Sequence, residues 1–443
     1  MNKYFLKSIR DKMPESLKYV TAPFFRNKLI KNKDFCKYYN LLESREVLSS
    51  ERIKEYQLSQ TKGILVYSYQ NVPYYTELFN KINFNPEKLN SFDDIKIIPF
   101  LTKEIIRENF NKLISRKRIK NGSYIATTGG STGEPLKVLL DYNSIFKENA
   151  FIYYFRKKIG YRFEDKLATF RGIEFGDKLW KYNPMYNELI FSPFKLSRLT
   201  FENYVTQIND FEPQYLNGYL STIYFFAKLL SEHPIPIKIK LKGIFLISEN
   251  IDIGQREFIE KYFNVKSVTF YGQSERCIIA EEKIPNRYIF DPFYGFTEQI
   301  KIEDNLFSII GTGFLNHTMP LIRYKTDDIC TSYNRYFSID GSRKGTYGLY
   351  GKNNEYFGHA AFNFHSNIFK NITNYQFVQN EKGKSDLLII VNRDFKVSEI
   401  DLMHKEIDKK TKGIIDFNIK VVDSLILSPR GKFKMFISNI LNE

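Results

Sequence analysis

The stretch ATTGGSTGEPLK, residues 126–137, holds three glycines, three threonines and a serine within twelve positions. Glycines at 129, 130 and 133 let the backbone turn tightly, so that several amide N–H groups can face one bound anion. Hydroxyl groups add further donors at Thr127, Thr128, Ser131 and Thr132. The spacing of a Walker loop is absent, because Glu134 and Pro135 follow the last glycine. The stretch therefore fits the phosphates of a nucleotide, and it equally fits a plain hairpin loop.

The segments on either side of this loop predict alternating strands and helices. Apolar residues predict strands over 123–128 and 136–140, a helix over 144–158 and a strand within 165–172. Further on, a helix is predicted for LNGYLSTIYFFAKLLSEHP, and Pro234 stops it. A strand is then predicted for KGIFLIS, a helix for IGQREFIEKYF and a second strand for VKSVTFYG. This alternation indicates a βαβ unit with parallel strands, and such sheets bind ligands at the carboxyl ends of their strands. YGQSE, at 271–275, lies at one such end.

The rest of the chain predicts an α/β fold in two domains. Residues 1–92 have mostly helical patterns, and 296–310 predict two antiparallel strands. From about residue 351 the pattern is strand, helix, strand, loop and strand, which predicts a compact α+β module. We expect a large multi-layer N-terminal domain with mixed and parallel sheets over 1–350, and a small α+β C-terminal domain over 351–443.

Composition limits the classes of partner. Of 443 residues, 66 are Lys or Arg and 50 are Asp or Glu, which gives a net charge of +16. This charge fits either a solvated surface or a phosphate-rich partner, and the basic residues form no single long block. We expect no nucleic-acid partner, because the chain lacks helix-turn-helix, zinc-finger and RRM signatures. The three cysteines and five histidines are scattered, and no signal peptide or transmembrane segment is recognisable, so we expect a cytoplasmic protein.

Five segments together resemble motifs of one enzyme superfamily. These segments are TTGGSTGEP at 127–135, YGQSE at 271–275, MPLIRYKTDD at 319–328, GKNNE at 351–355 and SPRGKFKMFI at 428–437. In order and spacing they resemble the adenylate-forming enzymes, in the branch of the phenylacetate–CoA ligases and the CapK-like proteins of polysaccharide gene clusters.

The resemblance implies that ATP, with Mg²⁺, activates a small carboxylic acid as acyl-AMP and that pyrophosphate is released. The acyl group would then pass to CoA or to an amine, for example on a sugar, with a role in capsular or exopolysaccharide biosynthesis as one setting. A catalytically degenerate nucleotide-binding protein is the alternative. A monomer and a homodimer are both compatible with the sequence.

The resemblance also implies roles for particular residues. Thr127, Thr128, Gly129, Gly130, Ser131, Thr132 and Gly133 would hold the departing pyrophosphate. In the second motif, Gly272 and Ser274 would help bind the nucleotide, Tyr271 would stack on adenine, and Glu275 would act in catalysis and hold Mg²⁺. Asp328 would bind the ribose hydroxyls. Its neighbour Asp327 replaces a family glycine, and Asp is one of the few residues that tolerate a positive φ.

The C-terminal motifs carry the remaining roles. Lys432 would reach the α-phosphate region as the catalytic lysine. Lys352, where the family has Arg, would contact the nucleotide, and Asn354 would be the hinge between two orientations of the small domain.

The acyl pocket is expected to draw on 145–175 and 243–250, including Phe170, Ser248 and Glu249. Arg171 would either meet a charged group of the substrate or pair with Glu174.

Overall fold

The computed structural model divides the chain into two compact units. The first unit comprises Met1–Asp165, Pro184–Asn187 and Val268–Gly341, and the second comprises Lys166–Asn183, Glu188–Ser267 and Ser342–Glu443. The structure describes residues 14–117, 122–127, 136–173, 175–333, 336–342, 348–358, 362, 370–429 and 431–440. The predicted domain boundary at residue 351 stays a prediction.

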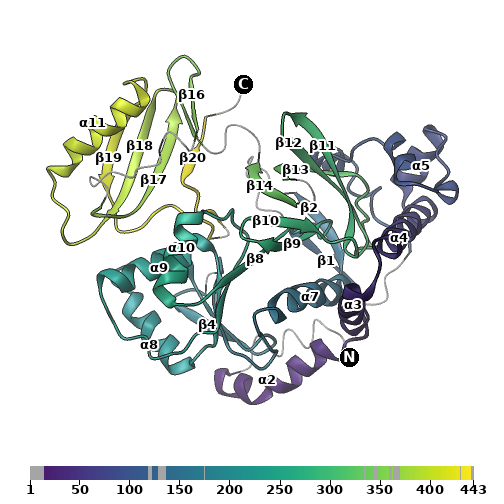
Figure 1. The fold of residues 1–443 in the computed structure, drawn as a ribbon, viewed down its shortest axis with the longest axis horizontal. Coiled ribbons are helices and arrows are strands. Elements are labelled where there is room, and N and C mark those ends of the chain that lie inside the picture. Colours follow the sequence, from purple (N-terminus) through teal and green to yellow (C-terminus); the bar gives the residue numbers. More distant parts are fainter. Residues whose placement is uncertain are drawn as a thin grey trace. The chain divides into compact units, whose positions relative to one another are not determined.

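The first unit begins with the helices that the sequence predicts. They are α2 (Glu15–Ile30), α3 (Lys33–Ser44), α4 (Ser50–Asn71) and α5 (Pro73–Lys81), shown in Figure 1. Pro73 separates α4 from α5 and occupies the first turn of α5, where its missing N–H costs no hydrogen bond. As the sequence indicates, Thr102 caps α6 (Lys103–Glu108), since its side chain accepts from the Ile105 amide. Short 3₁₀ helices η1 to η4 cover Arg45–Val47, Pro86–Lys88, Phe92–Ile97 and Pro193–Lys195, the last in the second unit.

The strands of the first unit form a hairpin and a larger sheet. The hairpin pairs β1 (Ser123–Thr127) with β2 (Lys137–Asp141) in antiparallel fashion, and α7 (Tyr142–Lys157) follows directly. The larger sheet has the order β11 (Gly295–Glu303), β12 (Leu306–Gly313), β13 (Tyr324–Tyr333), β14 (Tyr336–Ser342), β10 (Arg287–Phe290), β9 (Ile279–Ile284) and β8 (Ser267–Gly272). The predicted antiparallel pair over 296–310 is confirmed by β11 and β12.

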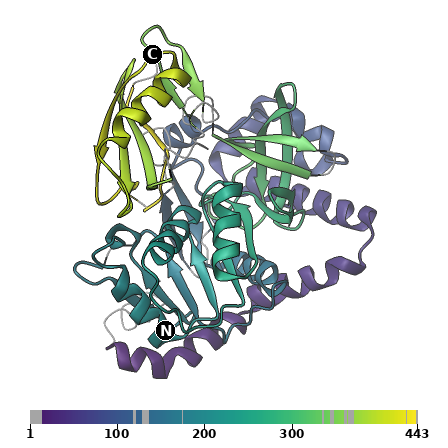
Figure 2. The same cartoon turned by 60° about the vertical axis from the view of Figure 1, so that its left-hand side comes forward.

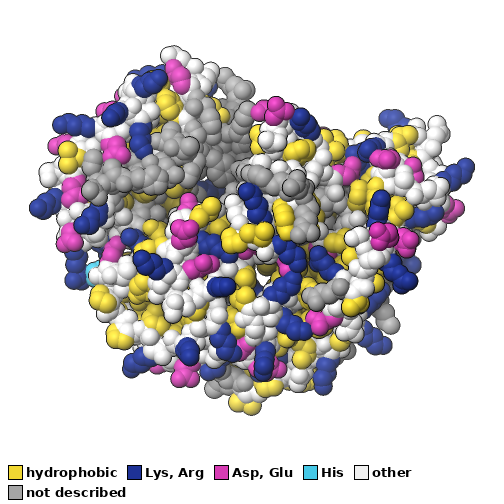
Figure 3. All heavy atoms as spheres, in the orientation of Figure 1, with side chains coloured by type: hydrophobic (Ala, Val, Ile, Leu, Met, Phe, Trp, Pro, Cys, Tyr) yellow, Lys and Arg dark blue, Asp and Glu magenta, His cyan; other side chains and the backbone are white. Residues whose placement is uncertain are grey.

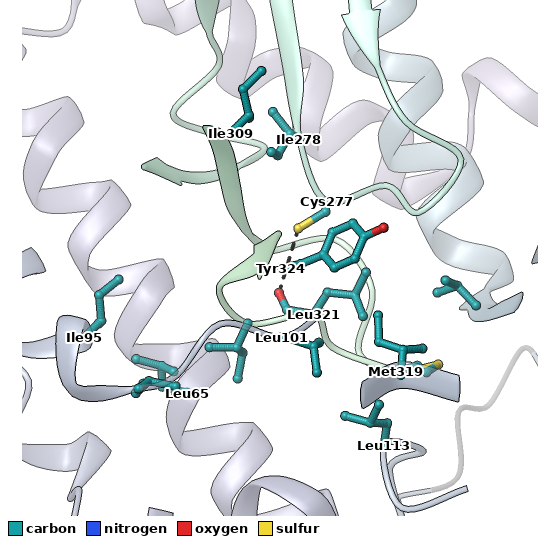
Figure 4. Packing of buried hydrophobic residues seen from close by; sticks show 14 of the residues in the cluster. Leu65, Ile95, Leu101, Leu113, Cys277, Ile278, Ile309, Met319, Leu321 and Tyr324 are labelled. Carbon is teal, nitrogen blue, oxygen red and sulfur yellow. Dashed lines mark hydrogen bonds between the residues drawn. The ribbon is translucent and has the colours of Figure 1, made fainter. Parts of the chain in front are cut away.

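An apolar core holds these elements together. Figure 4 shows part of it, including Leu65, Leu101 and Leu321. The Cys277 thiol donates to the Leu321 carbonyl over 3.9 Å. The core thus fixes β8, β9 and the segment before β13, which carry two of the five motifs.

The second unit contains the parallel strands. Its order is β7 (Gly243–Leu246), β6 (Tyr215–Gly218), β3 (Leu167–Phe170), β5 (Glu188–Phe191) and β4 (Trp180–Asn183). Only the β4–β5 pair among these is antiparallel. Helices α8 (Phe201–Phe211), α9 (Leu220–Glu232) and α10 (Ile253–Phe263) accompany them.

The predicted start of one helix in this unit is wrong. Residues 216–218, predicted as the start of a helix, instead lie in β6. Tyr219 is the N-cap residue, and α9 begins only at Leu220. All four residues of β6 are buried, so the strand has no alternation that distinguishes it from a buried helix. Gly218 is needed there because a Cβ would lie 2.6 Å from the Phe170 carbonyl oxygen of β3.

The C-terminal module belongs to the same unit. A sheet of order β19 (Asp416–Val421), β18 (Lys384–Val391), β17 (Ile372–Glu381) and β20 (Phe436–Ser438) packs against α11 (Glu399–Thr411), seen in yellow in Figure 1 and Figure 2. A hairpin of β15 (Gly348–Tyr350) and β16 (Tyr356–Gly358) precedes it. The α+β character is confirmed, although the sequence did not predict β17.

Surface charge is mixed on the face drawn in Figure 3, where Lys and Arg alternate with Asp and Glu. None of the helices in the described part of the chain is both long and apolar enough to cross a bilayer.

Candidate active site

The predicted phosphate loop connects β1 to β2. Thr127 ends β1 and pairs with Lys137 of β2, while Thr128, Gly129, Gly130, Ser131, Thr132 and Gly133 lie outside the described residues. The MPLIRYKTDD segment contacts strand β2 of this hairpin, because the Leu139 amide donates to Met319 Sδ over 3.4 Å. Asn316, just before that segment, donates to the Leu139 carbonyl over 2.9 Å. Residues 316 and 319, distant in sequence, therefore contact strand β2, which follows the loop in the chain.

A chain of hydrogen bonds joins the YGQSE motif to Asp328. The Tyr271 hydroxyl donates to Asp328 Oδ2 over 2.7 Å, and Gln273 Nε2 donates to the Tyr271 oxygen over 2.6 Å. Gln273 Nε2 also lies 3.5 Å from Asp328 Oδ2. Within the described residues, the buried Oε1 of Gln273 has no hydrogen-bond partner. Buried polar atoms are normally satisfied, so this acceptor could take a further hydrogen bond.

Burial sets the protonation of this group of residues. Burial raises the pKa of the Asp328 carboxyl, although hydrogen bonds from Tyr271 and Gln273 oppose the rise. Burial and the nearby Asp328 charge place the pKa of Tyr271 well above its ordinary value. The Tyr271 hydroxyl therefore keeps its proton at neutral pH and acts as a donor.

Glu275 lies beside this cluster. Its Oε1 accepts from the Tyr324 hydroxyl over 2.8 Å, and burial raises the pKa of the carboxyl. The described residues contain no group of three Asp, Glu, His or Cys side chains that could hold a metal by themselves. Mg²⁺ is usually bound by one or two carboxylates together with substrate phosphates and water. A single carboxylate such as Glu275 fits a metal shared with a nucleotide.

The two adjacent aspartates have different partners. Asp327 forms an ion pair with Lys103, with Nζ and Oδ2 3.0 Å apart, whereas Asp328 meets Tyr271. Asp327 has φ of 69°, which confirms that Asp stands at a left-handed position where the family has glycine. Of the two carboxylates, Asp328 is therefore the one that belongs to the tyrosine cluster.

Arg323 organises this segment, a role that the sequence did not reveal. Its guanidinium makes two parallel hydrogen bonds to Glu298, of 2.9 and 2.8 Å, and donates to the Lys96 carbonyl over 2.8 Å and to the Ile98 carbonyl. Such a fork fixes orientation as well as position. Arg323 thus holds the start of β13 in place, and Asp328 lies within that strand.

In the second unit, the segment that carries Lys432 packs against the strand ends. The Ser428 amide donates to the Lys432 carbonyl over 2.9 Å, and the Lys432 amide donates to Ser428 Oγ over 3.0 Å. Gly431 has φ of 70°, and a Cβ on it would lie 2.7 Å from Gly172 Cα. The Phe433 amide donates to Glu249 Oε1 over 3.0 Å. Lys432 is therefore placed between contacts to the residues that follow β3 and β7.

The predicted acyl-pocket residues separate into different roles. Phe170 is fully buried and stacks on Phe191, with ring centroids 5.3 Å apart, so it is a core residue and that prediction is wrong. Arg171 pairs with Glu188 over 3.1 Å, while Glu174 lies outside the described residues. Ser248 is exposed with φ of 61°.

The junction residues lie at the hairpin of β15 and β16. Lys352 forms an exposed ion pair with Asp416, with Nζ and Oδ2 3.2 Å apart. Asn354 has φ of 68°, the kind of backbone angle expected for it. The nucleotide contact of Lys352 and the hinge role of Asn354 stay predictions. The second unit contains Lys352, Asn354 and Lys432, and the first unit contains Tyr271 and Asp328.

Comparisons with known proteins agree with the resemblance. No family model matches the chain. The chain is 25% identical over 435 residues to protein CapK of Staphylococcus aureus, covering 94% of this chain and 95% of CapK. It is 24% identical over 306 residues to phenylacetate–coenzyme A ligase of Pseudomonas putida, covering 65% of this chain and 69% of the ligase.

A solved structure shares the fold. It is 2-hydroxyisobutyryl-CoA ligase in the postadenylation state in complex with R3-HIB-AMP, with a TM-score of 0.65 at 14% identity over 90% of this chain and 92% of that chain. The resemblance to CapK and phenylacetate–CoA ligases and the adenylate-forming fold are both confirmed.

Proposed function

We propose that this homologue of CapK and of the phenylacetate–coenzyme A ligases, built on the adenylate-forming fold, is an AMP-forming ligase that activates a carboxylic acid with ATP. The observation that carries the proposal is the cluster of Tyr271, Gln273 and Asp328 beside Glu275. Among the described residues, it offers an aromatic ring, an acceptor without a hydrogen-bond partner and a carboxylate, which suit a nucleoside with its amino and hydroxyl donors.

The adenosine part of ATP would be bound by this cluster. Asp328 would accept from the ribose hydroxyls, and the ring of Tyr271 would stack on the base. Gln273 would hold the Tyr271 hydroxyl in place and offer its Oε1 to a donor of the nucleoside. Gly272 and Ser274 follow Tyr271 in the chain and would line the same site.

The phosphates would be bound by the glycine-rich loop and by Glu275. Residues 127–133 would hold the β- and γ-phosphates on backbone amides and hydroxyls. Glu275 would hold Mg²⁺ together with the phosphates. A bound Mg²⁺ would neutralise part of the phosphate charge.

In the first half-reaction, an oxygen of the substrate carboxylate bonds to the α-phosphorus of ATP, and the bond from that phosphorus to the bridging oxygen breaks. Pyrophosphate leaves with the electron pair. Lys432 would stabilise the charge that develops on the bridging oxygen, because a fixed ammonium costs no reorganisation during the reaction.

In the second half-reaction the acyl group would pass to an acceptor, with release of AMP. CoA is the acceptor that we favour, since the phenylacetate and 2-hydroxyisobutyryl relatives are both CoA ligases by name. An amine acceptor, for example on a sugar, is the second candidate.

A panel of carboxylic acids tests this function. The purified protein is mixed with ATP, Mg²⁺ and each acid, and exchange of label between pyrophosphate and ATP is measured. We expect exchange that requires one class of acid, followed by consumption of CoA or of an amine. ATP binding by calorimetry without exchange for any acid would contradict the proposal and favour a catalytically degenerate nucleotide-binding protein.

A further inference from the structure

A half-buried glutamate in the second unit has no role in the chemistry proposed above. Glu249 follows β7, and its two oxygens accept three hydrogen bonds. Oε2 accepts from the Ser221 amide over 2.9 Å, and Oε1 accepts from Ser221 Oγ over 2.9 Å and from the Phe433 amide over 3.0 Å. Ser221 lies in the first turn of α9, whose N-cap residue Tyr219 makes no side-chain cap. Glu249 therefore supplies from another element the negative group that a helix N-terminus favours.

The third hydrogen bond reaches the segment that carries Lys432. Phe433 is the next residue after Lys432, and the turn before it is closed by the two hydrogen bonds between Ser428 and Lys432. On the other side of Lys432, Gly431 packs against Gly172 so closely that no Cβ fits. The packing of Gly431 against Gly172 therefore holds the chain on one side of Lys432, and the hydrogen bond from the Phe433 amide to Glu249 holds it on the other. A side-chain substitution can remove the hydrogen bond without altering the backbone.

The far end of α9 provides an independent contact with the C-terminal module. Glu232 accepts from Thr373 Oγ1 of β17 over 2.7 Å and from Arg198 over 3.3 Å. This contact joins the same helix to the same module, and it does not touch the segment that carries Lys432. It therefore serves as a matched comparison for the Glu249 contact.

We propose that Glu249 is a positioning residue. It fixes the segment that carries Lys432, here called the Lys432 segment, against the ends of β3 and β7, and it thereby positions the Lys432 side chain for the adenylation step alone. The inference rests on the proposed function, because it concerns the lysine assigned to that step. Hydrogen bonds to an ionised group are stronger than those to a neutral one, so a carboxylate suits this task better than an amide. Electrostatics agree, since the Lys432 charge opposes the rise in the pKa of Glu249 that burial causes.

The proposal predicts a separation between the two half-reactions. Lys432 acts where pyrophosphate leaves, whereas transfer of the acyl group from acyl-AMP to CoA breaks a different bond and releases AMP. Loosening the Lys432 segment should therefore slow the first step and spare the second. A residue that only maintained the fold would affect both.

The test compares Glu249→Ala, Glu249→Gln and Thr373→Val with the wild type, using an acid that supports exchange. For Glu249→Ala we expect kcat of pyrophosphate–ATP exchange to fall about 10- to 100-fold, with the KM for ATP changed less than about twofold. For Glu249→Gln the kcat of pyrophosphate–ATP exchange should fall less, because the one carbonyl oxygen of the glutamine can still accept from the Phe433 amide or from the Ser221 amide. Thioester formation from synthetic acyl-AMP and CoA should stay within about twofold of wild type in all variants, and Thr373→Val should retain exchange. Equal loss in both half-reactions, or full exchange in Glu249→Ala, would overturn the proposal.

A second measurement does not depend on activity. Hydrogen exchange of the amides in residues 431–436 is compared between wild type and Glu249→Ala without substrates. We expect the Phe433 amide hydrogen to exchange faster in Glu249→Ala, and no such change in Thr373→Val. An unchanged rate of hydrogen exchange at Phe433 in Glu249→Ala would overturn the proposed contact. If the wild type exchanged no label with any acid, the proposed function would fail, and hydrogen exchange would still decide whether Glu249 holds the segment.

Discussion

The Tyr271 hydroxyl donates to Asp328 Oδ2 over 2.7 Å, and this bond joins residues of two different motifs that are 57 positions apart in the chain. Gln273 extends the pair, because its amide donates to the same tyrosine oxygen. The three side chains form the part of the first unit that we assign to adenosine. The assignment makes specific expectations for each of them.

Replacing Gln273 tests the adenosine site. Gln273→Leu removes the donor to Tyr271 and the Oε1 acceptor, which has no hydrogen-bond partner in the described part of the chain. We expect the affinity for ATP with Mg²⁺ to fall about tenfold, which corresponds to about 1.4 kcal/mol, measured by calorimetry. Gln255→Leu, on α10 and outside the cluster, should bind ATP as the wild type does. Equal affinities of wild type and Gln273→Leu would remove Gln273 from the site.

Glu275→Gln should reveal a conflict between stability and function. Burial raises the pKa of Glu275 above its ordinary 4.5, so the folded protein binds this proton more tightly than the unfolded chain. Stability is therefore lost as pH rises from 4.5 through the raised pKa, and the ionised carboxylate costs stability at neutral pH. The glutamine has no charge and can still accept from Tyr324.

We accordingly expect Glu275→Gln to be more stable than wild type in urea at neutral pH, and the difference to vanish below the ordinary pKa of 4.5. Pyrophosphate exchange should be lost in the same variant. A variant that is less stable at neutral pH would contradict this account of the carboxyl.

Arg323→Ala tests whether the fork organises the segment before Asp328. The change leaves Glu298 and the Lys96 carbonyl without their partner in a buried place. We expect the free energy of unfolding to fall by about 3–5 kcal/mol in chemical denaturation. Lys112→Ala, which breaks the exposed pair with Glu77, should cost less than about 1 kcal/mol. Similar losses in the two variants would show that the fork is not a major support.

Much of the fold could be predicted because its segments have clear periodicity or caps. Helix α10 coincides with the predicted IGQREFIEKYF, and the Thr102 cap and the β11–β12 hairpin were recognisable from local chemistry. Strand β6 was missed because a short buried strand has no polar alternation, and the following apolar helix pattern extends into it.

The candidate site was predictable only where it lies within motifs. Tyr271, Asp328 and the positive φ of Asp327 follow from short stretches of sequence, and the structure brings the first two together. The bonds of Arg323 to Glu298 and of Glu249 to Phe433 join residues that are far apart in the chain. No local pattern encodes such pairs, since they arise only when the elements pack. Phe170 was misassigned for the same reason, because a strand end alone does not tell a lining residue from a core residue.

The most direct test of the central claim is the rate of acid-dependent exchange of label between pyrophosphate and ATP in Lys432→Ala, with Lys434→Ala as the control on the same segment. If Lys432 stabilises the charge on the departing pyrophosphate, its loss should slow exchange about 10²- to 10³-fold, or about 3–4 kcal/mol, while Lys434→Ala keeps the wild-type rate. Full exchange in Lys432→Ala, with the same acid and ATP, would contradict the account.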